Sequence, residues 1–304
     1  MSMHIVIPLL LLMGLLSLSY SGWGPGHHLE FAERVLRRRR ERLPKQVGSL
    51  LHEHRQAYRY GNLAADIINI KAYGEHQGHC HRWTIVDDMR SRAHTDAQEA
   101  FILGYLSHLA ADTIAHNHFV PYHLSRYART RGLGHLYWEM NADRFISEKR
   151  WDLIPALKNE RDLDAMDELV NATVPKKALS MGANKLLFNH VLLVAERKSW
   201  RRGMESLHPL QKVSIGRGFL ARFQRAAVDR VVLALHPTGV RDLQHIDTTG
   251  KRAQAQALQI RKEVLRETKR GLAREQLAAE RAAPFLNGMQ SPPPVDSDAQ
   301  PHWS

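Results

Sequence analysis

The residues with the clearest potential for chemistry lie in one apolar stretch, from Gly104 to His123. This stretch is rich in Leu, Ile and Ala, yet it carries five ionisable side chains: His108, Asp112, His116, His118 and His123. His108 and Asp112 are four residues apart, so a helix projects both from one face. Two ligand types at this spacing can bind a single zinc ion. The same pair can also be structural, because the carboxylate can accept a hydrogen bond from the buried imidazole. The spacing of His108 and Asp112 alone leaves both interpretations open.

Further metal-ligand types lie in other segments of the first half of the chain. His135 and Glu139, in "HLYWE", repeat the spacing of four on a second predicted helix. The other candidates are Asp66, the two histidines of "HCH" (His79 and His81), and His28, while His118 lies beyond the expected end of the first helix. Carboxylates are seldom fully buried unless they are paired or bound to a metal. Taken together, these residues predict a metal centre.

The composition predicts that helices position these residues. The 304 residues are 43% hydrophobic and only 7% aromatic, and Leu, Ala, Arg and Glu are abundant, which favours an all-α fold. The strongest predicted helix spans residues 96–115, with Thr95 or Asp96 as its cap and Pro121 ending the region. Other predicted helices span 28–43, 135–151, 180–201 and 211–235. Residues 58–67 are interpreted as a helix end followed by a loop with a turn at Gly61, and 74–83 as a His-rich loop.

The two ends of the chain differ from its middle. An apolar run of 14 residues, from Ile5 to Leu18, predicts a signal peptide over residues 1–22 and a secreted or periplasmic protein. An uncleaved leader would instead anchor the chain to a membrane, and no transmembrane span is expected in the mature chain. We then expect a helical domain over 23–250, a charged helix over 251–285 and a disordered tail over 286–304.

Charge and cysteine content limit the possible partners. The formal net charge of +12 favours anionic partners, such as phosphate groups, nucleic acid or an acidic membrane surface. Cys80 is the only cysteine, which excludes an internal disulfide framework.

The order of the motifs resembles a known family. "HLAADTIAHNH" supplies H-x3-D-x5-H and "HLYWE" supplies H-x3-E, while "WGPGHH" and "YGNLAADI" precede them. This order is similar to that of the zinc-dependent phospholipase C family and of the single-strand-specific zinc nucleases that share its fold. The resemblance runs from about Trp23 to Arg150. It implies an all-helical bundle with three zinc ions in a cleft.

The resemblance also implies which residues hold each ion. One zinc would be held by Asp66, His81, His108 and Asp112, with His79 as the alternative to His81. A second would be held by Trp23, His28 and Asp112, with Asp112 bridging the two ions; the Trp23 contribution requires cleavage directly before it. The third would be held by His118, His135 and Glu139. His27, His94, His116 and His123 fall outside this pattern, and we expect them to surround the ligands or to lie at the surface.

Phosphodiester hydrolysis is the chemistry that such a centre implies. A water bridging two zinc ions would lose a proton near neutral pH and attack phosphorus, and Asp66 would serve as general base. The expected substrate is a phospholipid, cleaved to diacylglycerol and a phosphorylated headgroup, with transient contact between protein and membrane surface. Two alternatives remain: a nuclease acting on single-stranded nucleic acid, and a catalytically silent zinc-binding scaffold whose charged arm at 251–283 docks an acidic partner or a membrane.

Overall fold

The computed structural model of the chain describes residues 22–68, 79–127, 138–139, 141–160, 163–174, 181–183 and 215–290. Over these ranges the chain forms helices and no strands, which confirms the predicted all-α bundle. None of the helices in the described ranges combines the length and the apolar character that crossing a membrane requires. The predicted helix over 180–201 lies outside the described residues, apart from 181–183.

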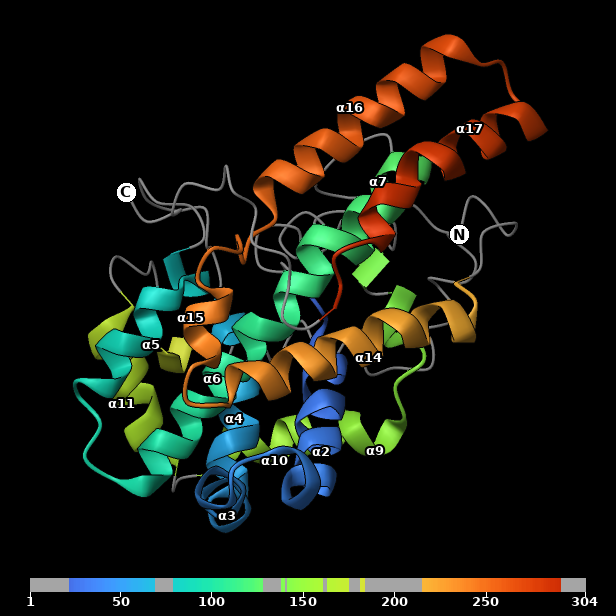
Figure 1. Cartoon of the computed structure of the whole chain (residues 1–304). Helices are drawn as coiled ribbons and strands as arrows, with labels where there is room; N and C mark the ends of the chain where they lie inside the picture. Colours follow the sequence, from blue (N-terminus) through green and yellow to red (C-terminus); the bar gives the residue numbers. More distant parts are fainter. Residues whose placement is uncertain are drawn as a thin grey trace, which may run out of the picture.

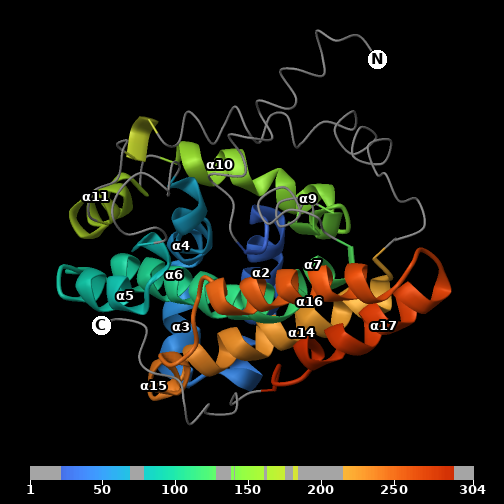
Figure 2. The same ribbon diagram turned by 90° about the horizontal axis from the view of Figure 1, so that it is seen from above.

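Two central helices, α4 (Arg55–Ile67) and α6 (Asp96–Ile114), form the middle of the bundle. The helices α2 (Pro25–Arg42) and α14 (Arg217–Ala234) pack against them, as Figures 1 and 2 show. Helix α6 begins where the sequence predicts, with a capping box between Thr95 and Gln98. Almost all of α6 is buried, so the ionisable residues that it carries are buried as well.

The expected turn at Gly61 is wrong, because Gly61 lies inside α4. A Cβ at Gly61 would lie 2.0 Å from the carbonyl oxygen of Phe101 on α6, and a Cβ at Gly104 would lie 2.2 Å from that of Tyr58 on α4. These glycines therefore let the two backbones touch. The close approach of two backbones, rather than a turn, explains Gly61.

A widened helical turn follows α6. The π-helix η2 (Ala115–Phe119) leads directly into α7 (Val120–Tyr127), so Pro121 lies within a helix and does not end the region as predicted. A proline ring normally collides with the carbonyl group one turn earlier, and a wider turn relieves that collision. The Asn117 side chain donates to the Thr113 carbonyl at 2.9 Å and to the Asp247 carbonyl at 2.8 Å, which fixes the turn.

Shorter elements surround this centre. They are α3 (Lys45–Glu53), the 3-10 turn η1 (His79–His81), α5 (Trp83–Arg90), α9 (Glu148–Trp151), α10 (Leu153–Asn159), α11 (Asp164–Thr173) and α15 (Gly239–Leu243). The predicted continuous helix over 135–151 is wrong in its second half, because the chain leaves the helix before Ser147 and α9 begins after it.

The charged segment near the end of the chain forms two helices rather than one. Helix α16 (Lys251–Glu267) and helix α17 (Leu272–Ala282) lie side by side as a hairpin, followed by the 3-10 turn η4 (Ala283–Leu286). Gly271, with φ of 118°, allows the chain to reverse between them. Both helices pack against α7, and the hairpin projects from the bundle (Figure 1).

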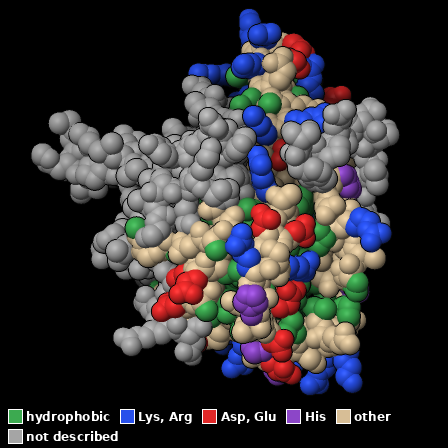
Figure 3. All heavy atoms as spheres, turned by 90° about the vertical axis from the view of Figure 1, so that its left-hand side faces the viewer, with side chains coloured by type: hydrophobic (Ala, Val, Ile, Leu, Met, Phe, Trp, Pro, Cys, Tyr) green, Lys and Arg blue, Asp and Glu red, His purple; other side chains and the backbone are tan. Residues whose placement is uncertain are grey.

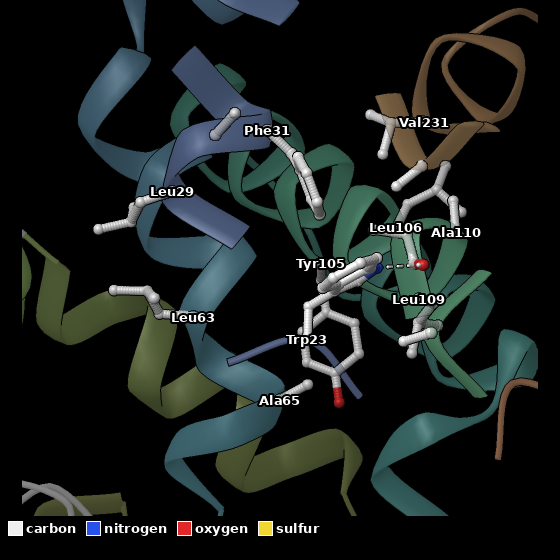
Figure 4. Close-up of a cluster of buried hydrophobic side chains, with 14 of the residues drawn as sticks. Trp23, Leu29, Phe31, Leu63, Ala65, Tyr105, Leu106, Leu109, Ala110 and Val231 are labelled. Atoms are coloured by element: carbon white, nitrogen blue, oxygen red, sulfur yellow. Dashed lines mark hydrogen bonds between the residues drawn. The ribbon is translucent and has the colours of Figure 1, made fainter. Parts of the chain in front are cut away.

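Trp23 anchors the beginning of the described chain in the hydrophobic core. Its ring lies among side chains of α2, α4 and α6 (Figure 4). It also stacks on Phe119 at a centroid distance of 5.0 Å. The indole N–H donates to the Ala111 carbonyl at 3.1 Å, the bond drawn in Figure 4. This packing fixes the backbone of Trp23 beside the ionisable residues of α6.

Candidate metal centre

Three helices and one turn bring five metal-ligand side chains together at the centre of the bundle. His28 comes from α2, Asp66 from α4, His81 from η1, and His108 and Asp112 from α6. All five side chains are buried. We call these five residues the histidine–aspartate cluster.

Asp112 is the hub of the histidine–aspartate cluster. Its Oδ1 lies 3.3 Å from His28 Nε2, and its Oδ2 lies 3.2 Å from His108 Nε2 and 3.4 Å from His81 Nε2. One carboxylate therefore faces three imidazole nitrogens that come from three different elements.

Asp66 faces the same imidazoles from the opposite helix. Its carboxylate oxygens lie 3.8 Å from His108 Nε2, 3.9 Å from His81 Nε2 and 3.9 Å from His28 Nε2. The ligand atoms form two overlapping groups that could each hold an ion, within 4.8 Å of one another: His28 with His108 and Asp112, and Asp66 with His81 and His108. His108 Nε2 can bind only one ion, so adjacent ions here would have to share a carboxylate such as that of Asp112.

Burial and mutual charge set the protonation of the cluster. Burial lowers the pKa of His28, and the neighbouring His108 lowers it further. Burial opposes charge on His108 too, but Asp112 and Asp66 outweigh it and raise the pKa of His108. Burial likewise opposes the Asp112 anion, yet His108 and His28 hold the pKa of Asp112 well below its usual range. Asp112 therefore stays ionised in the interior, as a bridging metal ligand must.

The polar atoms of the cluster fit a metal better than a purely structural network. The Nδ1 atom of His28 is buried and lacks a hydrogen-bond partner within the described part of the chain, while its Nε2 faces the Asp112 carboxylate at 3.3 Å. Such an imidazole loses the free energy of its missing hydrogen bond, unless a metal takes a lone pair. The His28 ring also stacks on His108 at a centroid distance of 3.8 Å, so their Nε2 atoms face the same carboxylate.

Neighbouring groups orient the ligands. The His108 Nδ1–H donates to the Asn62 carbonyl at 2.9 Å, which directs Nε2 into the cluster. The backbone carbonyl of His81 accepts from the Thr248 hydroxyl, and Cys80 Sγ lies 3.2 Å from His81 Nδ1. Metal-bound histidines characteristically use their second ring nitrogen in this way.

The backbone at Trp23 reaches the same carboxylates. The Trp23 N–H donates to Asp112 Oδ1 at 3.0 Å, and the Gly22 N–H donates to Glu139 Oε1 at 2.5 Å. A Cβ at Gly22 would lie 2.1 Å from Asp112 Oδ1, so only glycine fits against the cluster here. Trp23, Glu139 and the cluster are therefore neighbours, as the motif order suggests.

The expected third ligand set is only partly covered by the described residues and stays a prediction. The His118 Nδ1–H donates to the Phe285 carbonyl at 3.0 Å. Burial lowers the pKa of His118 to about 4, so this imidazole is neutral near pH 7. His135 and the side chain of His79 lie outside the described residues. Of this set, Glu139 alone is seen at the edge of the cluster, through its contact with Gly22.

His116 belongs to the site, although the motif pattern omits it. The side chain is buried, and its Nε2 lies 3.6 Å from Asp112 Oδ2. Gln254 Nε2, from α16, lies 3.3 Å from His116 Nδ1. A sequence signal for it exists, because His116 follows Asp112 by the same four residues that separate Asp112 from His108.

His27, expected around the ligands or at the surface, packs beside Trp23. His27, expected outside the ligand pattern, is buried between two polar partners, Asp143 and Gln224, whose amide nitrogen lies 3.0 Å from its Nε2. Its ring stacks on Trp23 at a centroid distance of 4.7 Å. His27 therefore supports the Trp23 backbone from behind the cluster. Nothing in the spacing of Asp143 or Gln224 predicts this pairing.

The fold and the site together define an all-helical protein with a buried cluster of histidine and aspartate side chains that could hold metal ions. Residues 27–191, more than half of the chain, match the family model described as zinc dependent phospholipase C. The chain belongs to this family, which confirms the resemblance seen in the motifs. Neither a curated protein nor a solved structure shows a significant match to the chain.

Proposed function

We propose that the chain hydrolyses the phosphodiester bond between diacylglycerol and the headgroup of a phospholipid. One observation carries the proposal: five buried His and Asp side chains, drawn from separate elements, converge in a chain of the zinc dependent phospholipase C family. Such a donor set suits zinc, whereas Mg²⁺ and Ca²⁺ prefer oxygen ligands.

The residues of the cluster have two proposed roles: metal ligand and general base. His28, His81, His108 and Asp112 would hold zinc, with Asp112 shared between two ions. Bound zinc would supply Lewis-acid polarisation of the phosphoryl group and lower the pKa of an attacking water. Asp66 lies across the cluster from Asp112 and is our candidate for the general base that accepts the proton of this water. Asp112, whose pKa is held low, stays anionic throughout.

Zinc content and turnover of an Asp112→Asn variant test this assignment. We expect the variant to lose bound zinc, measured by atomic emission, and to lose hydrolysis of phospholipid vesicles. Asp229→Asn is the matched control, because Asp229 lies away from the cluster and pairs with Arg42 at 2.8 Å. Unchanged zinc content in Asp112→Asn would refute the ligand assignment.

Hydrolysis of single-stranded nucleic acid is the second candidate function. A cavity of about 460 Å³ between α2 and α14 is lined by five arginines: Arg34, Arg37, Arg38, Arg42 and Arg225. Together with the net charge of +12, such a surface favours a polyanion. Assays on phospholipid vesicles and on single-stranded DNA, each with and without chelator, separate the two. Zinc-loaded protein that cleaves neither would point to the silent scaffold.

Removal of the leader before Trp23 would complete the site. The Trp23 nitrogen lies 3.0 Å from Asp112 Oδ1, so a free amine there would face the metal ligands directly. We infer export with cleavage at this bond as part of the proposed function. N-terminal sequencing of the mature protein tests it, and a terminus at Gly22 would contradict it.

A further inference from the structure

The most exposed apolar residue of the described chain lies at the far end of the α16–α17 hairpin. We call residues 265–274 the hairpin tip. Leu272 is 70% exposed and Leu265 is 38% exposed, and they are the two exposed large hydrophobic side chains among the described residues. Leu272 is the first residue of α17, directly after the reversal at Gly271. The turn lies at the end of a projecting arm (Figure 1), and the aliphatic side chain of Leu272 is exposed there.

Basic side chains surround these leucines. Arg266, Lys269 and Arg270 are exposed and form no ion pair with the rest of the described chain. Glu267 is the acidic residue within the tip, and Arg281 binds both of its carboxylate oxygens, at 2.8 and 2.6 Å. Figure 3 shows blue Lys and Arg side chains gathered over the projecting upper end of the molecule. The hairpin tip is thus both apolar and cationic.

The hairpin holds its tip in a fixed place relative to the metal centre. The Arg281–Glu267 pair joins α17 to α16, and the Arg274 guanidinium donates to the Thr268 carbonyl across the turn. At the base, Gln254 contacts His116 and the Phe285 carbonyl accepts from His118. The helical rise from Gln254 to Glu267 corresponds to about 20 Å. The arm therefore has a defined length and begins at His116 and His118, beside the histidine–aspartate cluster.

We propose that the hairpin tip is a membrane anchor that docks on an anionic phospholipid surface. Leu272 enters the apolar boundary of the bilayer, while Lys269 and Arg270 bind the lipid phosphates; such a combination is what holds peripheral proteins at an interface. The inference rests on the proposed function in one respect, because it assumes that the substrate lies in the same surface. An anionic phospholipid surface is the partner that fits, because its phosphates complement the cationic side chains and its apolar interior accommodates the aliphatic side chain between them.

Vesicle binding of matched variants tests the anchor. The probe is vesicles of equal phosphatidylglycerol and phosphatidylcholine, with pure phosphatidylcholine for comparison. We expect Leu272→Asp to weaken binding about 10-fold and Lys269→Gln with Arg270→Gln to weaken it about 30-fold at low salt. The double variant Arg37→Gln with Arg38→Gln removes the same charge from the arginine-lined cavity and serves as the control. Binding that falls in this control but not in the tip variants would overturn the proposal.

A fluorophore at position 272 tests insertion directly. Cys80 is the only cysteine and is buried, so Leu272→Cys provides one accessible thiol for an environment-sensitive dye. We expect a blue shift on anionic vesicles, and none for the same dye on Arg55→Cys, which lies on the exposed surface of α4. Absence of a shift at position 272 would refute insertion.

Turnover of a short-chain phospholipid dissolved as monomers separates the anchor from the active site. The tip variants should hydrolyse it like the unmodified chain while losing activity on vesicles. Loss of activity on vesicles and monomers alike would contradict the anchor, and inactivity of the unmodified chain on both substrates would contradict the proposed function instead.

Discussion

The contact between Gly61 and Gly104 links the stability of the bundle to the geometry of the metal centre. A Cβ placed at Gly61 would lie 2.0 Å from the Phe101 carbonyl oxygen, whereas real Cβ contacts essentially never fall under 3.0 Å. The substitution Gly61→Ala therefore requires α4 and α6 to separate by about 1 Å or more. Overpacking of this kind costs about 1–3 kcal/mol, against which alanine regains about 1 kcal/mol of helix propensity.

The same separation would reach the cluster. Asp66 follows Gly61 on α4, His108 follows Gly104 on α6, and their ligand atoms are 3.8 Å apart. Metal sites tolerate displacements of only about 0.5 Å, so we expect zinc affinity to fall about 10- to 100-fold. We also expect the midpoint of thermal unfolding to fall by several degrees.

Gly218→Ala is the matched control for this experiment. Gly218 is likewise helical, in α14, but a Cβ there meets nothing within 4 Å. Its unfolding midpoint should stay the same or rise slightly, with zinc affinity unchanged. If Gly61→Ala unfolds at the same temperature as Gly218→Ala and binds zinc equally well, the link between helix contact and site is refuted.

Three further predictions concern titration and the metal. Burial lowers the pKa of His123 from 6.5 to about 3, so its neutral form stabilises the fold fully above pH 6.5 and this contribution is lost as pH falls toward 3, by up to about 1.4 kcal/mol per pH unit. The pH dependence of unfolding should flatten by that amount in His123→Gln, and an unchanged slope would argue against a buried neutral imidazole. Chelation should lower the unfolding midpoint, and zinc but not magnesium should restore it; Asp112→Asn should show no such shift. Gln254→Ala should weaken zinc binding about 10-fold with little loss of helicity by circular dichroism, because His116 loses a neighbour that orients it; equal affinity would show that His116 acts without this contact.

The sequence predicts the part of the site that depends on local spacing. His108 and Asp112 face one way because a helix places residues four apart on one side, and the ordered motifs add His28, Asp66 and His81. The role of His118 stays a prediction, because it lies within the π-helix and its described partner is the Phe285 carbonyl. His116 lies outside the motif order, although its spacing of four residues from Asp112 places it beside that carboxylate.

Tertiary contacts explain the other differences. Gly61 carries a strong local turn signal, yet it serves a helix crossing that only the partner helix reveals. Within residues 251–285, helix propensity runs through the whole segment, and the reversal depends on Gly271 and on Arg281 reaching back to Glu267. Helix propensity reports only the local preference of each residue. It therefore predicts neither the crossing of α4 and α6 at Gly61 nor the contact between Arg281 and Glu267.

The π-helix at Ala115–Phe119 also fixes the angular register of everything that follows it. It holds one residue more than a regular turn, and each residue in a helix rotates the chain by about 100°. That single residue therefore decides which side of α7 meets the α16–α17 hairpin and which side meets the core. In a relative without the extra residue, the residues that match those after position 120 would lie on a different face of the helix. A sequence alignment of this region therefore needs a one-residue gap before the histidines can be matched.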